Sequence, residues 1–158
     1  MAGMITELIA IMNEQVERHS ELYGLSLEEK DAILQNDIET LQKLIDLKSM
    51  VISQNNRLEK KRLSLVYDIA EVLALPNKDL SFSELLQVLE GKPEQDELRN
   101  VGERLRDGLH KLKEANDINK ELLETSIEFV QYSLNALRST ISPEETDIVA
   151  IAKGRPKQ

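Results

Sequence analysis

Hydrophobic positions recur at helical spacing along most of the chain, and the longest uninterrupted run covers residues 94–141. Its apolar side chains lie three or four residues apart, which places them on one face of a helix: Leu98, Val101, Leu105, Leu109, Leu112, Leu122, Leu123, Ile127, Val130, Leu134 and Leu137. At 1.5 Å per residue such a helix is roughly 70 Å long. Because its apolar face must be covered, we expect the rest of the chain to supply helices of similar length.

Two further helices are predicted before it, over residues 4–35 and 38–75. In the first, Gly24 is followed by Ser26 and Glu29, a spacing that can start a new helix. We favour a continuous or merely bent helix, because an internal glycine costs only about 1 kcal/mol. In the second, apolar residues repeat every seven positions, a coiled-coil-like seam: Leu44, Val51, Leu58, Leu65 and Val72.

The predicted connections are short. Asn36 tolerates a left-handed conformation and Asp37 can cap the next helix, so this pair predicts a tight hairpin and antiparallel neighbours. Pro76 should stop the second helix. Ser81 and Glu84 form a capping-box pattern that starts a short connector helix.

The predicted fold is therefore all-α. We expect an elongated antiparallel helical bundle with coiled-coil-like packing, formed by three long helices (about 4–35, 38–75 and 94–141) and a short helix (about 82–90). Residues 1–141 should form a single domain. A weakly helical or mobile tail, 142–158, should follow, with a basic end rich in glycine and proline.

Composition narrows the possible functions. With 29 acidic against 20 basic residues and a net charge of −9, the chain is an unlikely match for a nucleic-acid backbone. It has no cysteine, hence no disulfide or thiolate chemistry, which is compatible with a reducing cytosol. The apolar run 4–12 is short and contains Glu7, so we expect no membrane insertion and a cytoplasmic protein.

The search for catalytic or metal-binding residues gives little. Asp107 and His110 are a lone Asp-x-x-His, whereas a di-iron bundle needs two Glu-x-x-His pairs. No glycine-rich phosphate loop or nucleophile elbow is present. His19 lies on the apolar stripe, where a packing role is more common than a ligand role. We therefore predict no catalytic residue, no metal site and no cofactor.

Asn116 and Asn119 interrupt the stripe of the long helix. Either they pair inside the bundle with Asn55 or Arg62 and fix the helix register, or the bundle opens there. Further along, Phe129, Tyr132 and Ile141 add apolar surface beyond what one seam requires. This surface either binds a partner or is covered by the first helix or a second copy of the chain.

Several segments, in their order along the chain, resemble the FlgN-type flagellar export chaperones. The resemblance covers roughly residues 4–138 and rests on residues 32–41 (AILQNDIETL), 58–62 (LEKKR), 80–86 (LSFSELL), 116–123 (NDINKELL) and 129–134 (FVQYSL).

The resemblance implies a cytoplasmic, non-enzymatic chaperone. Such proteins bind the C-terminal amphipathic helices of hook-filament junction (hook-associated) proteins, prevent their premature assembly and deliver them to the flagellar type III export gate. The family binds clients through its C-terminal part, which makes the following residues the expected client site: Phe129, Tyr132, Leu134, Leu137, Ile141, Ile148 and Ile151. The alternative is a structural coiled-coil adaptor or homo-oligomeric scaffold, in which a homodimer fills the stripe.

Overall fold

The computed structural model describes residues 1–75 and 79–139, which form helices joined by short turns and contain no strand. The all-α prediction is confirmed. The bounds agree with the predicted ones to within a few residues: α1 Ala2–Leu34, α2 Ile38–Val72, α3 Phe82–Val88 and α4 Pro93–Arg138. The C-terminal tail, with Ile141, Ile148 and Ile151, lies outside the described residues.

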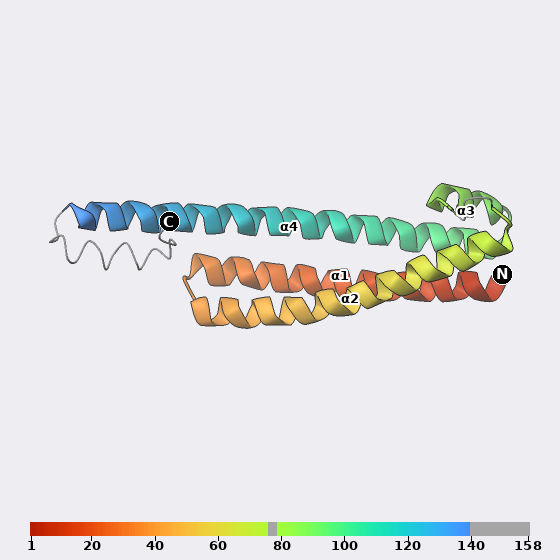
Figure 1. Ribbon diagram of the computed structural model, residues 1–158, viewed down its shortest axis with the longest axis horizontal. Helices are drawn as coiled ribbons and strands as arrows, with labels where there is room; N and C mark the ends of the chain where they lie inside the picture. Colours follow the sequence, from red (N-terminus) through yellow and green to blue (C-terminus); the bar gives the residue numbers. More distant parts are fainter. Residues whose placement is uncertain (76–78, 140–158) are drawn as a thin grey trace, which may run out of the picture.

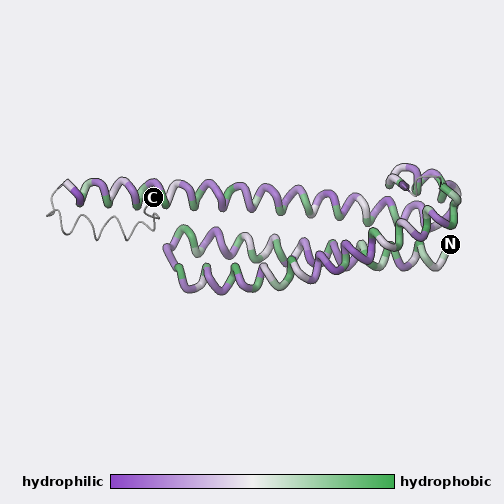
Figure 2. Tube along the Cα trace, in the orientation of Figure 1, coloured by the Kyte–Doolittle hydropathy of each residue, from purple (hydrophilic) through white to green (hydrophobic). Residues whose placement is uncertain are grey.

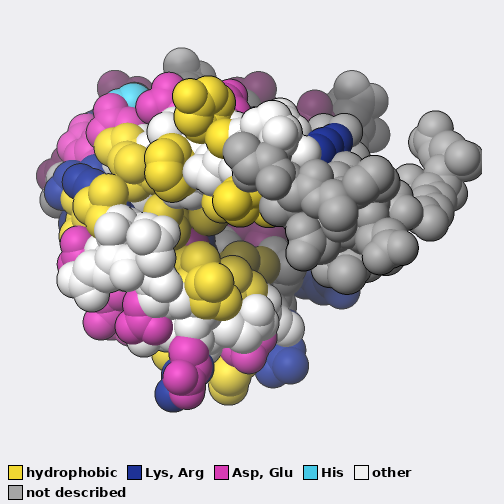
Figure 3. Space-filling view, turned by 90° about the vertical axis from the view of Figure 1, so that its left-hand side faces the viewer, with side chains coloured by type: hydrophobic (Ala, Val, Ile, Leu, Met, Phe, Trp, Pro, Cys, Tyr) yellow, Lys and Arg dark blue, Asp and Glu magenta, His cyan; other side chains and the backbone are white. Residues whose placement is uncertain are grey.

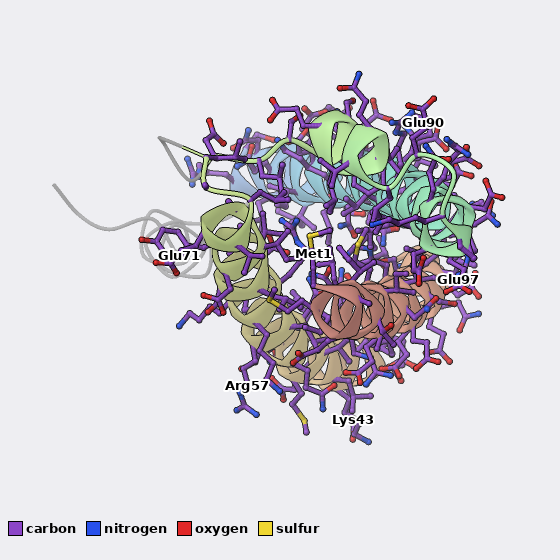
Figure 4. All side chains as sticks on the ribbon, turned by 90° about the vertical axis from the view of Figure 1, so that its right-hand side faces the viewer. Met1, Lys43, Arg57, Glu71, Glu90 and Glu97 are labelled. Carbon is purple, nitrogen blue, oxygen red and sulfur yellow. The ribbon has the colours of Figure 1, made fainter. Side chains whose placement is uncertain are left out.

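The central helix of the bundle is α1, which packs against α2 on one side and α4 on the other. Among the described residues, the backbones of α2 and α4 do not approach one another closely. Viewed from the α3 end, Met1 points into the space between the helices, whereas Lys43, Arg57 and Glu71 point outward (Figure 4). Where α2 and α4 meet, they do so through side chains, since residues of both helices share the apolar core.

At one end of the bundle, α4 continues past the α1–α2 hairpin, and at the other end α3 lies beside the start of α4 (Figure 1). Phe82 of α3 packs onto the backbone of α4, where a Cβ atom added to Gly102 would lie only 2.4 Å from the phenyl ring. Gly102 therefore permits this close approach.

The hairpin forms as its residues predict. Asn36 has a φ of 54°, and the amide of Asp37 donates to the carbonyl of Ala32 at 2.9 Å. The Asp37 side chain accepts from the amide of Thr40 at 3.1 Å, which caps α2. α1 is continuous through Gly24, and the Ser26 hydroxyl donates to the carbonyl of Leu22 instead of starting a new helix.

The end of α2 comes three residues earlier than predicted, at Val72 rather than residue 75. Ala74 adopts a left-handed conformation with φ of 57°, and the amide of Leu75 donates to the carbonyl of Ala70 at 3.1 Å. This bonding pattern ends a helix, and it usually places glycine where Ala74 lies. Pro76 is outside the described residues. The Ser81 cap of α3 is confirmed, with the Glu84 amide 3.1 Å from its hydroxyl.

The apolar core is concentrated toward the α3 end. It contains residues from all four helices and the turn after α3: Ile5, Leu8, Ile9, Ile11, Met12, Leu58, Leu65, Ile69, Leu85, Leu89, Leu98 and Val101. Hydrophobic and hydrophilic positions alternate along each helix, and the middle of the hairpin is conspicuously hydrophilic (Figure 2). The hairpin end is thus separated from the main core by a polar region.

Candidate functional site

An apolar groove lies where the tip of the α1–α2 hairpin faces α4, and we call it the hairpin groove. It encloses a cavity of about 350 Å³. It is lined by residues of all three long helices and the hairpin turn: Ala32, Ile33, Asn36, Asp37, Ile38, Leu41, Leu123, Ser126, Ile127, Val130, Gln131 and Leu134. Figure 3 looks onto this end of the molecule, where hydrophobic side chains gather around a hollow.

The floor and walls of the hairpin groove differ in exposure. Ala32 and Ile33 of α1 are buried and form the floor. The walls are open to solvent, with Ile38 of α2 76% exposed, and Ile127 and Val130 of α4 56% and 54% exposed. Because the backbones of α2 and α4 stay apart here, neither wall covers the other. Contiguous exposed apolar side chains of this kind mark a binding surface.

A polar layer closes the inner end of the groove. The Lys48 ammonium of α2 lies 2.7 Å from the Glu29 carboxylate of α1 and 3.2 Å from the amide oxygen of Asn116 on α4. The Ser26 hydroxyl lies 3.0 Å from the same oxygen, and the Asn119 side chain donates to the carbonyl of Ser26 at 2.8 Å. This layer links the three long helices by side chains, and it fixes their register.

The prediction of hydrogen bonding inside the bundle is confirmed for Asn119, which is buried, whereas Asn116 is hydrogen-bonded at an exposed position; the predicted partners are wrong for both. Arg62 instead pairs with Glu59 one turn earlier on its own helix, with Nε 2.9 Å from Oε2. Asn55 makes no hydrogen bond to either asparagine among the described residues. The partners are instead Ser26 of α1 and Lys48, which lies nearer the start of α2.

A second polar layer lies nearer the main core. The Gln15 side chain donates to the Glu59 carboxylate at 2.8 Å. The hydrogen bond from Arg62 is the main reason that the pKa of Glu59 lies below its usual value. Burial lowers the pKa of His19, against the opposing charge of Glu59. Within the described ranges no three His, Cys, Asp or Glu side chains are arranged to hold a metal ion. His19 is 5% exposed and lies against α4 at Gly108.

The structure separates the predicted client residues into groups. Leu134 lines the hairpin groove. Phe129 and Tyr132 are 69% and 73% exposed, but at 100° per residue they lie about 140° and 160° around α4 from Leu134. They therefore point away from the groove. Leu137 is 54% exposed, one turn beyond Leu134.

The α2 wall of the groove was not among the predicted site residues. On α2 the groove is lined by Ile38 and Leu41. Ile38 is the first residue of a second apolar row on α2, which continues away from the groove with Ile45 and Ile52, spaced by seven residues beside the buried row. These three side chains are 76%, 44% and 45% exposed. A helix with two apolar rows needs two partners, and α1 satisfies only one of them.

Fold and groove together define a class: an elongated helical protein with an open apolar surface at one end. In the described part of the chain no helix is long and apolar enough to cross a membrane. A family model described as FlgN protein matches residues 1–146, and the chain belongs to the FlgN family, a family of flagellar export chaperones rather than enzymes. No curated protein and no solved structure matches the chain.

Proposed function

We propose that this protein is a cytoplasmic flagellar export chaperone that binds the C-terminal helices of hook-filament junction proteins, keeps them from assembling prematurely and delivers them to the type III export gate. Membership of the FlgN family supports the chaperone role. The observation that carries the proposal is the hairpin groove, an unfilled apolar surface between three helices. We propose no catalytic activity.

The groove suits an amphipathic helix. The α2 wall between Ile38 and Lys48 spans ten residues, or about 15 Å of helix, which matches roughly three turns of a bound helix. A client helix lying there would complete a four-helix arrangement, with α1 as its floor and α2 and α4 as its walls. This is helix-in-groove recognition, in which apolar residues at positions i, i+3, i+4 and i+7 anchor the ligand.

The remaining predicted client residues form a second contact region in this proposal. Leu137 extends the groove side of α4, whereas Phe129 and Tyr132 occupy the opposite side of the same helix. A long client segment that wraps around the free end of α4 can use both sides. Binding must offset an ordering cost of about 2 to 5 kcal/mol for a disordered client, so we expect moderate, releasable affinity.

The test is co-purification of the full chain with a hook-filament junction protein expressed in the same cells. We expect a complex of the two proteins that is lost when the residues after Glu128 are deleted, because the deletion removes Val130, Gln131 and Leu134 from the groove. Retention of the client by the truncated chain would place the site elsewhere. Recovery of the chain alone, as a salt-resistant dimer, would favour the structural coiled-coil alternative.

A further inference from the structure

The hairpin groove lies close to the point where α4 ends. Its α4 wall extends from Leu123 to Leu134, and α4 ends four residues later, at Arg138. The helix between Leu123 and Arg138 is about 22 Å long. The chain then continues with residues 140–158. The segment that follows α4 therefore begins within about one helical turn of an open apolar surface of the same chain.

The sequence of this segment has the pattern of a short amphipathic helix. Residues 142–145 (SPEE) form a helix-start signal, with the serine as the cap and the proline at the first helical position. Residues 148–152 (IVAIA) are consecutive apolar residues in a chain that is 31% charged. Their spacing places Ile148, Ile151 and Ala152 on one face of such a helix. That face needs an apolar partner, because apolar surface in water is unfavourable.

The predicted helix has the length and the position needed to reach the groove. Residues 143–152 correspond to about 15 Å of helix. Helices joined by a short connection are usually antiparallel neighbours. A helix that runs back along α4 in this way has Ile148 at about the level of Leu134 and Ile151 at about the level of Val130. Both Leu134 and Val130 line the groove.

The groove is open on the side from which the segment would enter. Ile38 at the start of α2 is 76% exposed, and Val130 of α4 is 54% exposed. α3 lies at the opposite end of the bundle (Figure 1) and does not line the groove. A segment tethered to α4 has a local concentration in the millimolar range, which a separate molecule in the cytoplasm does not reach. A second copy of the chain therefore competes poorly with it.

We infer that residues 142–152 of the same chain, the tail segment, occupy the hairpin groove when no client is bound. Ile148 and Ile151 then take the place of the apolar residues of the client. This inference rests on the proposed function, in which a client helix binds in the same groove. The tail segment shields the groove of the empty chaperone, and a client must displace it. The apparent affinity for the client is reduced in proportion to the fraction of chains whose groove is free.

Photo-crosslinking of the full chain without client tests the contact itself. A photoreactive amino acid replaces Ile38 in the groove wall or, as the control, Arg57, which points outward from the bundle (Figure 4). The sample is an equal mixture of unlabelled and isotopically labelled chains, and the adducts are identified by mass spectrometry. Position 38 should be joined to the tail segment within one chain, and position 57 should not.

Two results of the crosslinking would overturn the inference. Adducts that join a labelled chain to an unlabelled one through the groove would identify a second copy as the occupant. Absence of any adduct between position 38 and the tail segment would show that the groove of the empty chaperone is not occupied by this segment.

Matched double variants test the competition with the client. Ile148→Ser with Ile151→Ser should raise the affinity for a hook-filament junction protein about fivefold, because the groove becomes free more often. Ala150→Ser with Lys153→Ser changes the opposite face of the predicted helix, about 160° and 140° from Ile148, and should leave the affinity within about twofold. Titration calorimetry on the full chain measures both.

The outcomes of this titration separate the inference from the proposed function. Equal affinities of the wild type and both double variants would overturn the inference, while the groove would remain a client site. A weaker affinity of the Ile148→Ser, Ile151→Ser variant would also overturn it, because the two isoleucines would then be client contacts. If no variant binds the client, the proposed function fails, and the adduct from position 38 alone decides whether the tail segment occupies the groove.

Discussion

Leu134→Asp is expected to weaken binding of a hook-filament junction helix by about a hundredfold or more, equivalent to about 2.7 kcal/mol, while the helical content stays near that of the wild type. Leu134 lines the hairpin groove but is only half-buried and does not belong to the main core. A bound client helix would desolvate the new carboxylate without a partner, which is costly. Titration calorimetry and circular dichroism measure the two effects.

The matched control is Leu63→Asp. Leu63 is 55% exposed on α2 and lies outside the groove lining, so the same substitution there should leave client binding within about twofold. A loss of helical content in Leu134→Asp would show that Leu134 is needed for the fold. Equal losses of binding in both variants would show that the groove has no special role.

Lys48→Met is expected to lower the free energy of unfolding by about 3 kcal/mol. The side chains of Lys48 and Glu29 are only 16% and 9% exposed, so removing the ammonium leaves a buried carboxylate without its counter-charge. The substitution also removes the hydrogen bond to Asn116, which joins α2 to α4. Urea unfolding followed by circular dichroism measures the change.

Lys43→Met is the control for this second prediction. Lys43 and Glu39 form an ion pair at 3.7 Å with side chains 73% and 85% exposed, and such surface pairs contribute little. The combination of Lys48→Met with Glu29→Gln should recover part of the lost stability, because no unpaired charge remains buried. A loss below about 1 kcal/mol for Lys48→Met alone would mean that Glu29 is solvated when its partner is gone.

Local chemistry explains why most of the fold was predictable from the sequence. The hairpin depends on Asn36 and Asp37, which act within a few residues of themselves. The start of α3 likewise depends on the pair of Ser81 and Glu84. The end of α2 was less predictable, because Ala74 takes a left-handed conformation for which alanine has no intrinsic preference.

The tertiary partners were harder to predict than the helices. The periodicity of α4 predicts that Asn116 and Asn119 face the bundle, and Asn119 is buried there, but it does not say which helix lies opposite them. The assignment to Asn55 and Arg62 chose the wrong positions: the partners are Lys48, nearer the start of α2, and Ser26 of α1. Spacing along one helix does not determine the order in which helices pack.

Only part of the candidate site was predicted, because the sequence does not show which helices lie opposite one another. Leu134 continues the apolar stripe of α4, so the sequence places it on the bundle side. To predict the α2 wall, one must know that Ile38 and Leu41 lie opposite α4. That arrangement depends on the length of α4 and on where the hairpin lies along it. Phe129 and Tyr132 remain predicted client contacts on the other side of α4.

Site-specific photo-crosslinking tests most directly whether the hairpin groove holds the client helix. A photoreactive amino acid replaces one residue at a time in the full chain: Leu41 in the groove wall, Phe129 on the far side of α4, or Val88 on α3. Illumination with a purified hook-filament junction protein should give an adduct from Leu41 and none from Val88. An adduct from Phe129 or Val88 without one from Leu41 would contradict the account, because the client would then bind outside the groove.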